Sequence, residues 1–120
     1  MFMFRSYPNP ITFTALVFSV LLSGCGFFGD EPDPTAGWSA QRLYDTAKAS
    51  MRGGSYNDAL TYYRKLETRY PFGPYSTQAQ LDSAYAYYKM NEPASSVAAS
   101  DRFIKLHPRH PNVDYAYYMK

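Results

Sequence analysis

The chain has 120 residues, which is enough for one domain and no more. The chain has 12 Lys and Arg residues and 10 Asp and Glu residues. Residues 1–24 contain one of these, Arg5, so the net charge of the remaining chain is 11 − 10 = +1. A charge so close to neutral gives no reason to expect nucleic-acid binding, which needs a basic face. The 13 Tyr and 8 Phe are many for this length, and Tyr suits helix contacts and binding surfaces.

Residues 1–24 have the pattern of a secretory signal peptide. Arg5 supplies a positive charge, residues 11–22 carry no charge, and small residues follow. As a helix, the uncharged run would span about 18 Å, less than the ~30 Å hydrocarbon core of a membrane. Counted on through Phe28 the run reaches eighteen residues, the lower limit for a spanning helix, so an uncleaved anchor is the alternative.

Cys25 is the only cysteine, so an internal disulfide cannot form. The stretch Leu22-Ser23-Gly24-Cys25 resembles the lipobox of bacterial lipoproteins. That resemblance implies S-diacylglycerol and N-palmitoyl groups on Cys25, cleavage before it, and a firm anchor because several acyl chains are buried. Gly26, in place of the Asp that commonly retains such proteins at the inner membrane, implies delivery to the outer membrane. The alternative is a free or buried cysteine, and no cofactor beyond the covalent lipid is expected.

Residues 25–37 form the expected lipidated N-terminus and flexible tether. The stretch GFFGDEPDPTAG is rich in Gly, Pro and acidic residues and shows neither a helical nor a strand period. Twelve residues in a coil reach on the order of 20 Å, so we expect the folded part to lie close to the membrane surface.

From Trp38 onward the apolar residues follow helical spacing. Ser39 is the expected N-cap of a first helix, which Gly53 and Gly54 end. Ser55 with Asp58 resembles an acidic capping box for a second helix, which the prolines between residues 71 and 74 end. The second helix carries one apolar stripe, formed by Tyr56, Ala59, Leu60, Tyr63, Leu66 and Tyr70.

The helical pattern repeats after 37 residues, which places Asp45 on Asp82 and Pro71 on Pro108. We predict an all-α, TPR-like α-solenoid of antiparallel helix pairs, with repeats at 38–74 and 75–111 and the start of a third at 112–120. These two and a half repeats are expected to be a piece of a longer solenoid. An ordinary antiparallel helical bundle is the alternative. The residues that fit tetratricopeptide (TPR) spacing are Ala47, Gly54, Tyr56, Ala59, Tyr63 and Pro71.

The second repeat matches less well than the first. Ser96 and Ser100 stand where the first repeat has Ala59 and Tyr63. We therefore expect Val97, Phe103 and Ile104 to carry the apolar face of its second helix.

A lipobox, an acidic Pro-rich tether and TPR helices together resemble the BamD (ComL) family, the TPR lipoproteins of the outer-membrane β-barrel assembly machine. The resemblance rests on residues 22–25, 43–74 and 101–120 and covers essentially the whole chain, but only the N-terminal half of a typical member. It implies a non-enzymatic scaffold on the outer membrane that faces the periplasm. The implied partners are BamA, the other lipoproteins of the machine and unfolded outer-membrane proteins.

In a TPR array the first helix of each pair lines the concave groove. The family's N-terminal repeats are proposed to bind the aromatic-rich C-terminal signal of substrates, and aromatic rings beside cations could hold such a peptide. The alternative is that these positions are ordinary packing or solvated residues. The expected inner-face residues also include Gln41, Asp45, Gln78 and Leu81, and the predicted peptide-binding candidates are Tyr44, Lys48, Arg52, Tyr85, Tyr88 and Lys89.

Other chemistry is poorly supported. His107, His110 and Asp114 lie around a Pro-flanked turn rather than on one helix face, so no metal site is expected. No catalytic grouping is visible, so no catalytic residues and no enzyme are expected. The rival functions are another TPR lipoprotein, such as a pilus-biogenesis or cell-wall factor, and a hydrolase that uses His107 or His110.

Overall fold

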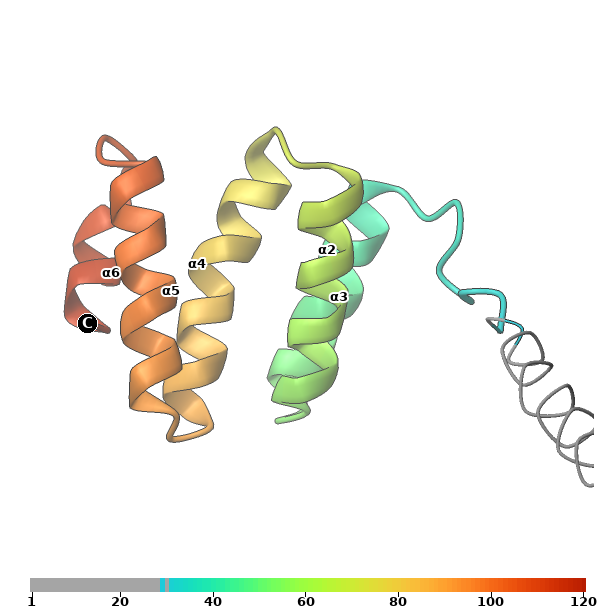
Figure 1. The fold of residues 1–120 in the computed structure, drawn as a ribbon, viewed down its shortest axis with the longest axis horizontal. Coiled ribbons are helices and arrows are strands. Elements are labelled where there is room, and N and C mark those ends of the chain that lie inside the picture. Colours follow the sequence, from blue (N-terminus) through green and yellow to red (C-terminus); the bar gives the residue numbers. More distant parts are fainter. Residues whose placement is uncertain (1–28, 30) are drawn as a thin grey trace, which may run out of the picture. The chain divides into compact units, whose positions relative to one another are not determined.

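The computed structural model describes residue 29 and residues 31–120 (Figure 1). The predicted signal peptide at 1–24 and the predicted lipid site at Cys25 lie outside these residues. The chain divides into two compact units, Met1–Pro34 and Thr35–Lys120, and all of the helices given below belong to the second. In the described part of the chain, no helix is long and apolar enough to cross a membrane.

Five helices follow one another along the second unit (Figure 1). They are α2 (Ala40–Arg52), α3 (Tyr56–Arg69), α4 (Pro74–Lys89), α5 (Pro93–Leu106) and α6 (Val113–Tyr118). Each packs on the next, and α2 also contacts α4. This sequential packing of two pairs and the start of a third confirms the predicted all-α, TPR-like fold. The exact division at residues 74 and 111 stays a prediction.

The helix ends follow from local chemistry, with one exception. The Ser39 hydroxyl accepts a hydrogen bond from the Arg42 backbone N–H at 3.2 Å, which confirms the predicted N-cap. The predicted capping box at Ser55 is wrong, because its side chain makes no capping hydrogen bond. Ser39 has the extended backbone that an N-cap requires, with ψ of 161°, whereas Ser55 has ψ of 65°. Gly54 turns the chain between α2 and α3 with φ of +77°.

The first helix pair has its own core, in which the predicted stripe is largely confirmed. Ala59, Leu60, Tyr63 and Leu66 are buried, whereas Tyr70 at the end of the stripe is 37% exposed. The buried cluster formed by α2 and α3 includes Ala79 of α4, and Tyr75 of α4 packs against it, so this core also joins the first pair to the second. The cluster consists of Leu43, Ala47, Ala59, Tyr63, Leu66 and Ala79.

The second core differs from the expectation in its small residues. Phe103 is fully buried, but Ile104 and Val97 are only half-buried. Ser96 and Ser100 are buried, and the Ser96 hydroxyl lies 3.1 Å from the Ala84 carbonyl oxygen. A small side chain at these positions lets α5 approach its neighbours closely, so the serines serve packing. The cluster consists of Leu81, Ala84, Phe103, Ala116 and Met119.

The residues just before α2 are held against the end of α3. Arg69 donates to the Thr35 carbonyl oxygen at 2.6 Å and to the Thr35 hydroxyl at 3.0 Å. Lys65 donates to the same hydroxyl at 3.2 Å, and the Tyr70 hydroxyl donates to the Trp38 carbonyl oxygen at 2.8 Å. Thr35 is only 2% exposed, so the helical unit begins at a fixed point five residues ahead of its first helix.

Candidate functional site

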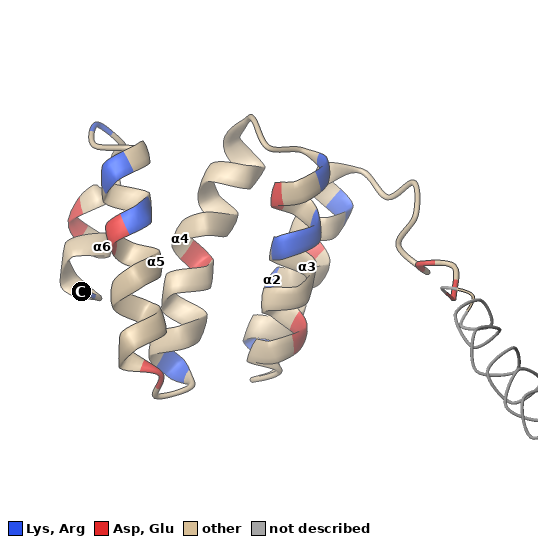
Figure 2. Cartoon of the chain, viewed as in Figure 1, with Lys and Arg blue, Asp and Glu red and all other residues tan. Residues whose placement is uncertain are grey.

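A single buried carboxylate joins the two helix pairs. Asp82 is the only acidic residue of α4 (Figure 2) and is 8% exposed. Its Oδ2 accepts hydrogen bonds from the Tyr44 hydroxyl at 3.0 Å and the Tyr63 hydroxyl at 3.1 Å. Gln78 donates to Oδ1 at 2.9 Å, and the Lys48 ammonium lies 3.4 Å from Oδ2. Two of the predicted groove residues, Tyr44 and Lys48, thus meet at one anion.

The environment of Asp82 keeps its tyrosine partners protonated. Desolvation by burial, followed by the negative charge of Asp82, raises the pKa values of the Tyr44 and Tyr63 hydroxyls well above their usual value. Both hydroxyls therefore remain hydrogen-bond donors at physiological pH.

Beside this network lies an open hollow of about 460 Å³. Its walls combine aromatic rings with short polar side chains, and the rings of Tyr44 and Tyr75 lie 5.5 Å apart at an angle of 46°. A hollow of this kind suits an aromatic side chain, because rings pack favourably in tilted arrangements. The lining residues are Tyr44, Pro74, Tyr75, Thr77, Gln78 and His110.

Tyr75 and His110 were not among the predicted site residues. Tyr75 could have been found, because it lies three residues before Gln78 and seven before Asp82 and so shares their helix face. His110 could not, since it reaches the hollow from the loop between α5 and α6, whose path no helical period fixes.

A second group of tyrosines links α4 to α6. The ring of Tyr85 lies 6.4 Å from that of Tyr88 and 6.2 Å from that of Tyr115. Tyr115 in turn lies 6.4 Å from Tyr118, which is 75% exposed. Tyr85 and Tyr88 were predicted, whereas Tyr115 and Tyr118 were missed. The 37-residue repeat could have predicted both residues. It aligns Tyr115 with Gln78 and Tyr118 with Leu81, which are both expected inner-face positions.

The remaining predicted residues are less closely joined. Arg52 and Lys89 are exposed in the last turns of α2 and α4, and within the described residues neither forms an ion pair. Gln41 and Asp45 are exposed as well. Leu81 was expected to face the groove, but it is 2% exposed and belongs to the core of the second pair.

The two histidines are engaged locally. His107 Nε2 lies 3.0 Å from Gln80 Oε1, and burial lowers the pKa of His107 below its usual value. His110 Nδ1 accepts a hydrogen bond from the Asn112 backbone N–H at 3.1 Å. Among the residues that the structure covers, no cluster of three His, Cys, Asp or Glu side chains could hold a metal ion.

Comparison with known proteins places the chain in a family. The family described as YfiO, outer membrane lipoprotein, matches residues 37–120. The chain belongs to this family. The family's description confirms the predicted location at the outer membrane. It also confirms the resemblance on which the predicted function depends.

Three relatives carry the name outer membrane protein assembly factor BamD. The chain is 42% identical over 102 residues to that of Neisseria meningitidis serogroup B, covering 82% of this chain and 38% of the relative. It is 37% identical over 109 residues to that of Vibrio cholerae, and the match covers 91% of this chain and 44% of the relative. It is 34% identical over 113 residues to that of Xylella fastidiosa, and the match covers 94% of this chain and 38% of the relative. The chain thus spans about two fifths of the length of these YfiO/BamD relatives, and their name agrees with a protein that is not an enzyme.

Proposed function

We propose that this chain is the N-terminal part of an outer-membrane scaffold in the β-barrel assembly (BAM) complex. It faces the periplasm, and it helps the assembly and insertion of β-barrel proteins. Its proposed partners are BamA, the other lipoproteins of that complex and unfolded outer-membrane proteins. The observation that carries the proposal is the family match over residues 37–120, together with relatives named as assembly factors.

The tyrosine-rich surface of α2, α4 and α6 is the proposed receiving site for substrate targeting peptides. The hollow beside Tyr44 takes an aromatic side chain, and Tyr88 and Tyr118 extend the aromatic surface. Arg52 and Lys89, which form no ion pair within the described residues, supply positive charge for a peptide carboxylate, and Lys48 adds to it although it also pairs with Asp82. Hydrophobic burial then provides affinity, and the charge fixes the direction in which the peptide lies.

The affinity for a targeting peptide, measured with and without the exposed ring of Tyr88, tests this function. Tyr88→Ala is expected to raise the Kd for a peptide about 10-fold, because a stacked aromatic contact of roughly 1.4 kcal/mol is lost. The probe is a fluorescent twelve-residue peptide with a barrel protein's C-terminal sequence, ending in Phe with a free carboxylate. Fluorescence anisotropy on the full-length protein gives the Kd.

The matched control is Tyr117→Ala. Tyr117 is 58% exposed, close to the 50% of Tyr88, but its ring contacts no other ring among the described residues. The control should bind as tightly as the wild type. Equal affinities of Tyr88→Ala and wild type would rule out this surface as the peptide site.

We also propose that Cys25 is the first residue of the mature protein and carries the lipid. The family's description as outer membrane lipoproteins supports this assignment. Mass spectrometry of the detergent-extracted protein should find diacylglycerol on its sulfur and palmitate on its amine. Cys25→Ser should leave the signal peptide uncut and free the protein from the outer-membrane fraction. An unmodified Cys25 in the mature protein would refute the proposal.

A further inference from the structure

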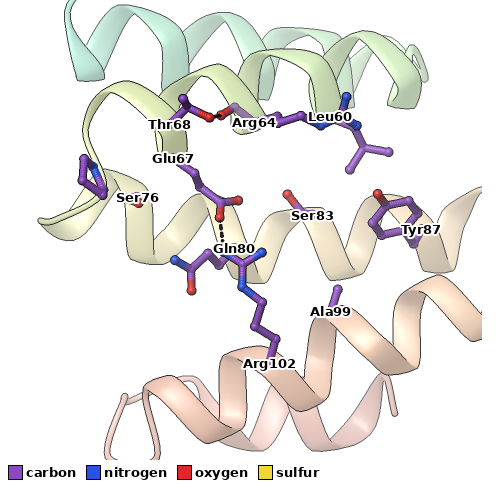
Figure 3. Close-up of a pocket in the computed structure, with 11 residues that line it drawn as sticks. Leu60, Arg64, Glu67, Thr68, Ser76, Gln80, Ser83, Tyr87, Ala99 and Arg102 are labelled. Atoms are coloured by element: carbon purple, nitrogen blue, oxygen red, sulfur yellow. Dashed lines mark hydrogen bonds and ion pairs between the residues drawn. The ribbon is translucent and has the colours of Figure 1, made fainter.

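A second groove lies between α3 and α5, with α4 as its floor (Figure 3). Its volume is about 430 Å³, within the range of ligand-binding pockets. It shares no lining residue with the aromatic hollow beside Tyr44. Its lining includes Leu60, Arg64, Ser76, Gln80, Tyr87 and Ala99.

One end of this groove is polar and incompletely satisfied. Ser76 is 1% exposed, and its hydroxyl has no hydrogen-bond partner among the described residues. A buried hydroxyl without a partner is costly, so an acceptor atom supplied by a ligand would relieve that cost. Gln80 lies one turn further along α4, and its amide nitrogen makes no hydrogen bond in the part of the chain described.

The charges at the groove favour an anion. Glu67 on α3 and Arg102 on α5 form an ion pair across the groove at 2.6 Å (Figure 3). Arg64 is exposed and has no ion-pair partner within the described residues. The three charges sum to +1, so one guanidinium remains to attract a carboxylate.

The other end of the groove is apolar. In Figure 3, Leu60, Tyr87 and Ala99 line the half of the groove away from Ser76. Each comes from a different helix, so the apolar part of the groove is lined by α3, α4 and α5. The groove therefore offers apolar contact, a free cation and unpaired hydrogen-bonding groups along one line.

We propose that this groove binds an extended segment of a partner polypeptide that carries an acidic side chain. The carboxylate pairs with Arg64, an apolar side chain of the segment contacts Leu60, Tyr87 and Ala99, and a backbone carbonyl accepts from Ser76. An extended segment fits better than a helix, because its backbone groups are unpaired and can bond to Ser76 and Gln80. This site is independent of the proposed aromatic peptide site.

Peptide selection followed by mutation tests the proposal. A phage library of random twelve-residue peptides is selected on the full-length protein. An excess of the Phe-terminated peptide is present, so that it occupies the aromatic site during the selection. The recovered peptides should be enriched in Asp and Glu. For a synthetic copy, Arg64→Glu should raise the Kd at least 10-fold, and Glu→Gln in the peptide should do the same. Isothermal titration calorimetry measures each Kd.

Two further variants separate binding from folding. Ser76→Ala removes a hydroxyl that has no partner, so the protein should unfold at an unchanged or higher urea concentration while its peptide affinity falls about 3-fold. Arg109→Glu makes the same charge change at an exposed loop residue outside the groove and should leave the Kd within 2-fold. Recovery of no peptides, of peptides without acidic residues, or of peptides that bind Arg64→Glu normally would overturn the proposal.

Discussion

Replacing Asp82 by alanine is expected to lower the free energy of unfolding by about 3 kcal/mol at neutral pH. The carboxylate accepts hydrogen bonds from Tyr44, Tyr63 and Gln78, and its loss leaves the Tyr63 hydroxyl buried without a partner. Tyr63 is fully buried, so water cannot replace the lost acceptor. Urea unfolding of the full-length protein, followed by circular dichroism, measures the change.

Two variants show whether the network or the charge matters. Asp101→Ala removes an exposed carboxylate that pairs with Lys120, and it should leave the free energy of unfolding nearly unchanged, because water screens the pair. Asp82→Asn keeps one acceptor oxygen and should fall between alanine and the wild type. If Asp82→Ala destabilised the protein no more than Asp101→Ala, the Asp82 network would not contribute to joining the helix pairs.

Replacing Phe103 by alanine is expected to cost about 3–5 kcal/mol, the usual range for a buried aromatic ring. Phe103 is fully buried in the core of the second pair, and its ring lies 5.2 Å from the rings of both His107 and His110. The cavity would lie between α4, α5 and α6, so the loop that carries His110 should loosen as well. The urea midpoint gives the stability, and hydrogen exchange of the amides of residues 107–112 follows the loop.

Leu106→Ala is the matched control for Phe103→Ala. Leu106 lies on the same helix but is 55% exposed, so its truncation should change stability by less than about 1 kcal/mol. Equal effects of the two substitutions would show that the second pair does not depend on the core that surrounds Phe103.

The helices could be predicted because local signals agree with one another. Gly53 and Gly54 end α2, proline begins α4, and the stripe through Ala59 and Tyr63 lies on the buried side of α3. Each signal acts within a few residues, so the sequence alone contains it. The predicted capping role of Ser55 was wrong because capping depends on the backbone angle ψ of that residue, which the residue type does not determine.

The contacts at the site could not be predicted in the same way. The 37-residue shift aligns Asp45 with Asp82, yet Asp45 is exposed and Asp82 is buried. Asp82 meets side chains of the helix pair that precedes it, whereas within the described residues no helix pair precedes α2. Position within a repeat is encoded locally, but the environment of that position depends on which neighbour stacks against it.

The attachment of Thr35 to Arg69 has a mechanical consequence. In the proposed lipidated protein, the ten residues 25–34 would separate the lipid on Cys25 from this attachment, and ten residues span at most about 35 Å. Tension along those residues would act on Thr35, which hydrogen bonds from both Arg69 and Lys65 hold against α3. The helix α2, which supplies Tyr44, begins five residues after Thr35, so that load would reach the anchored Thr35 before it reached α2.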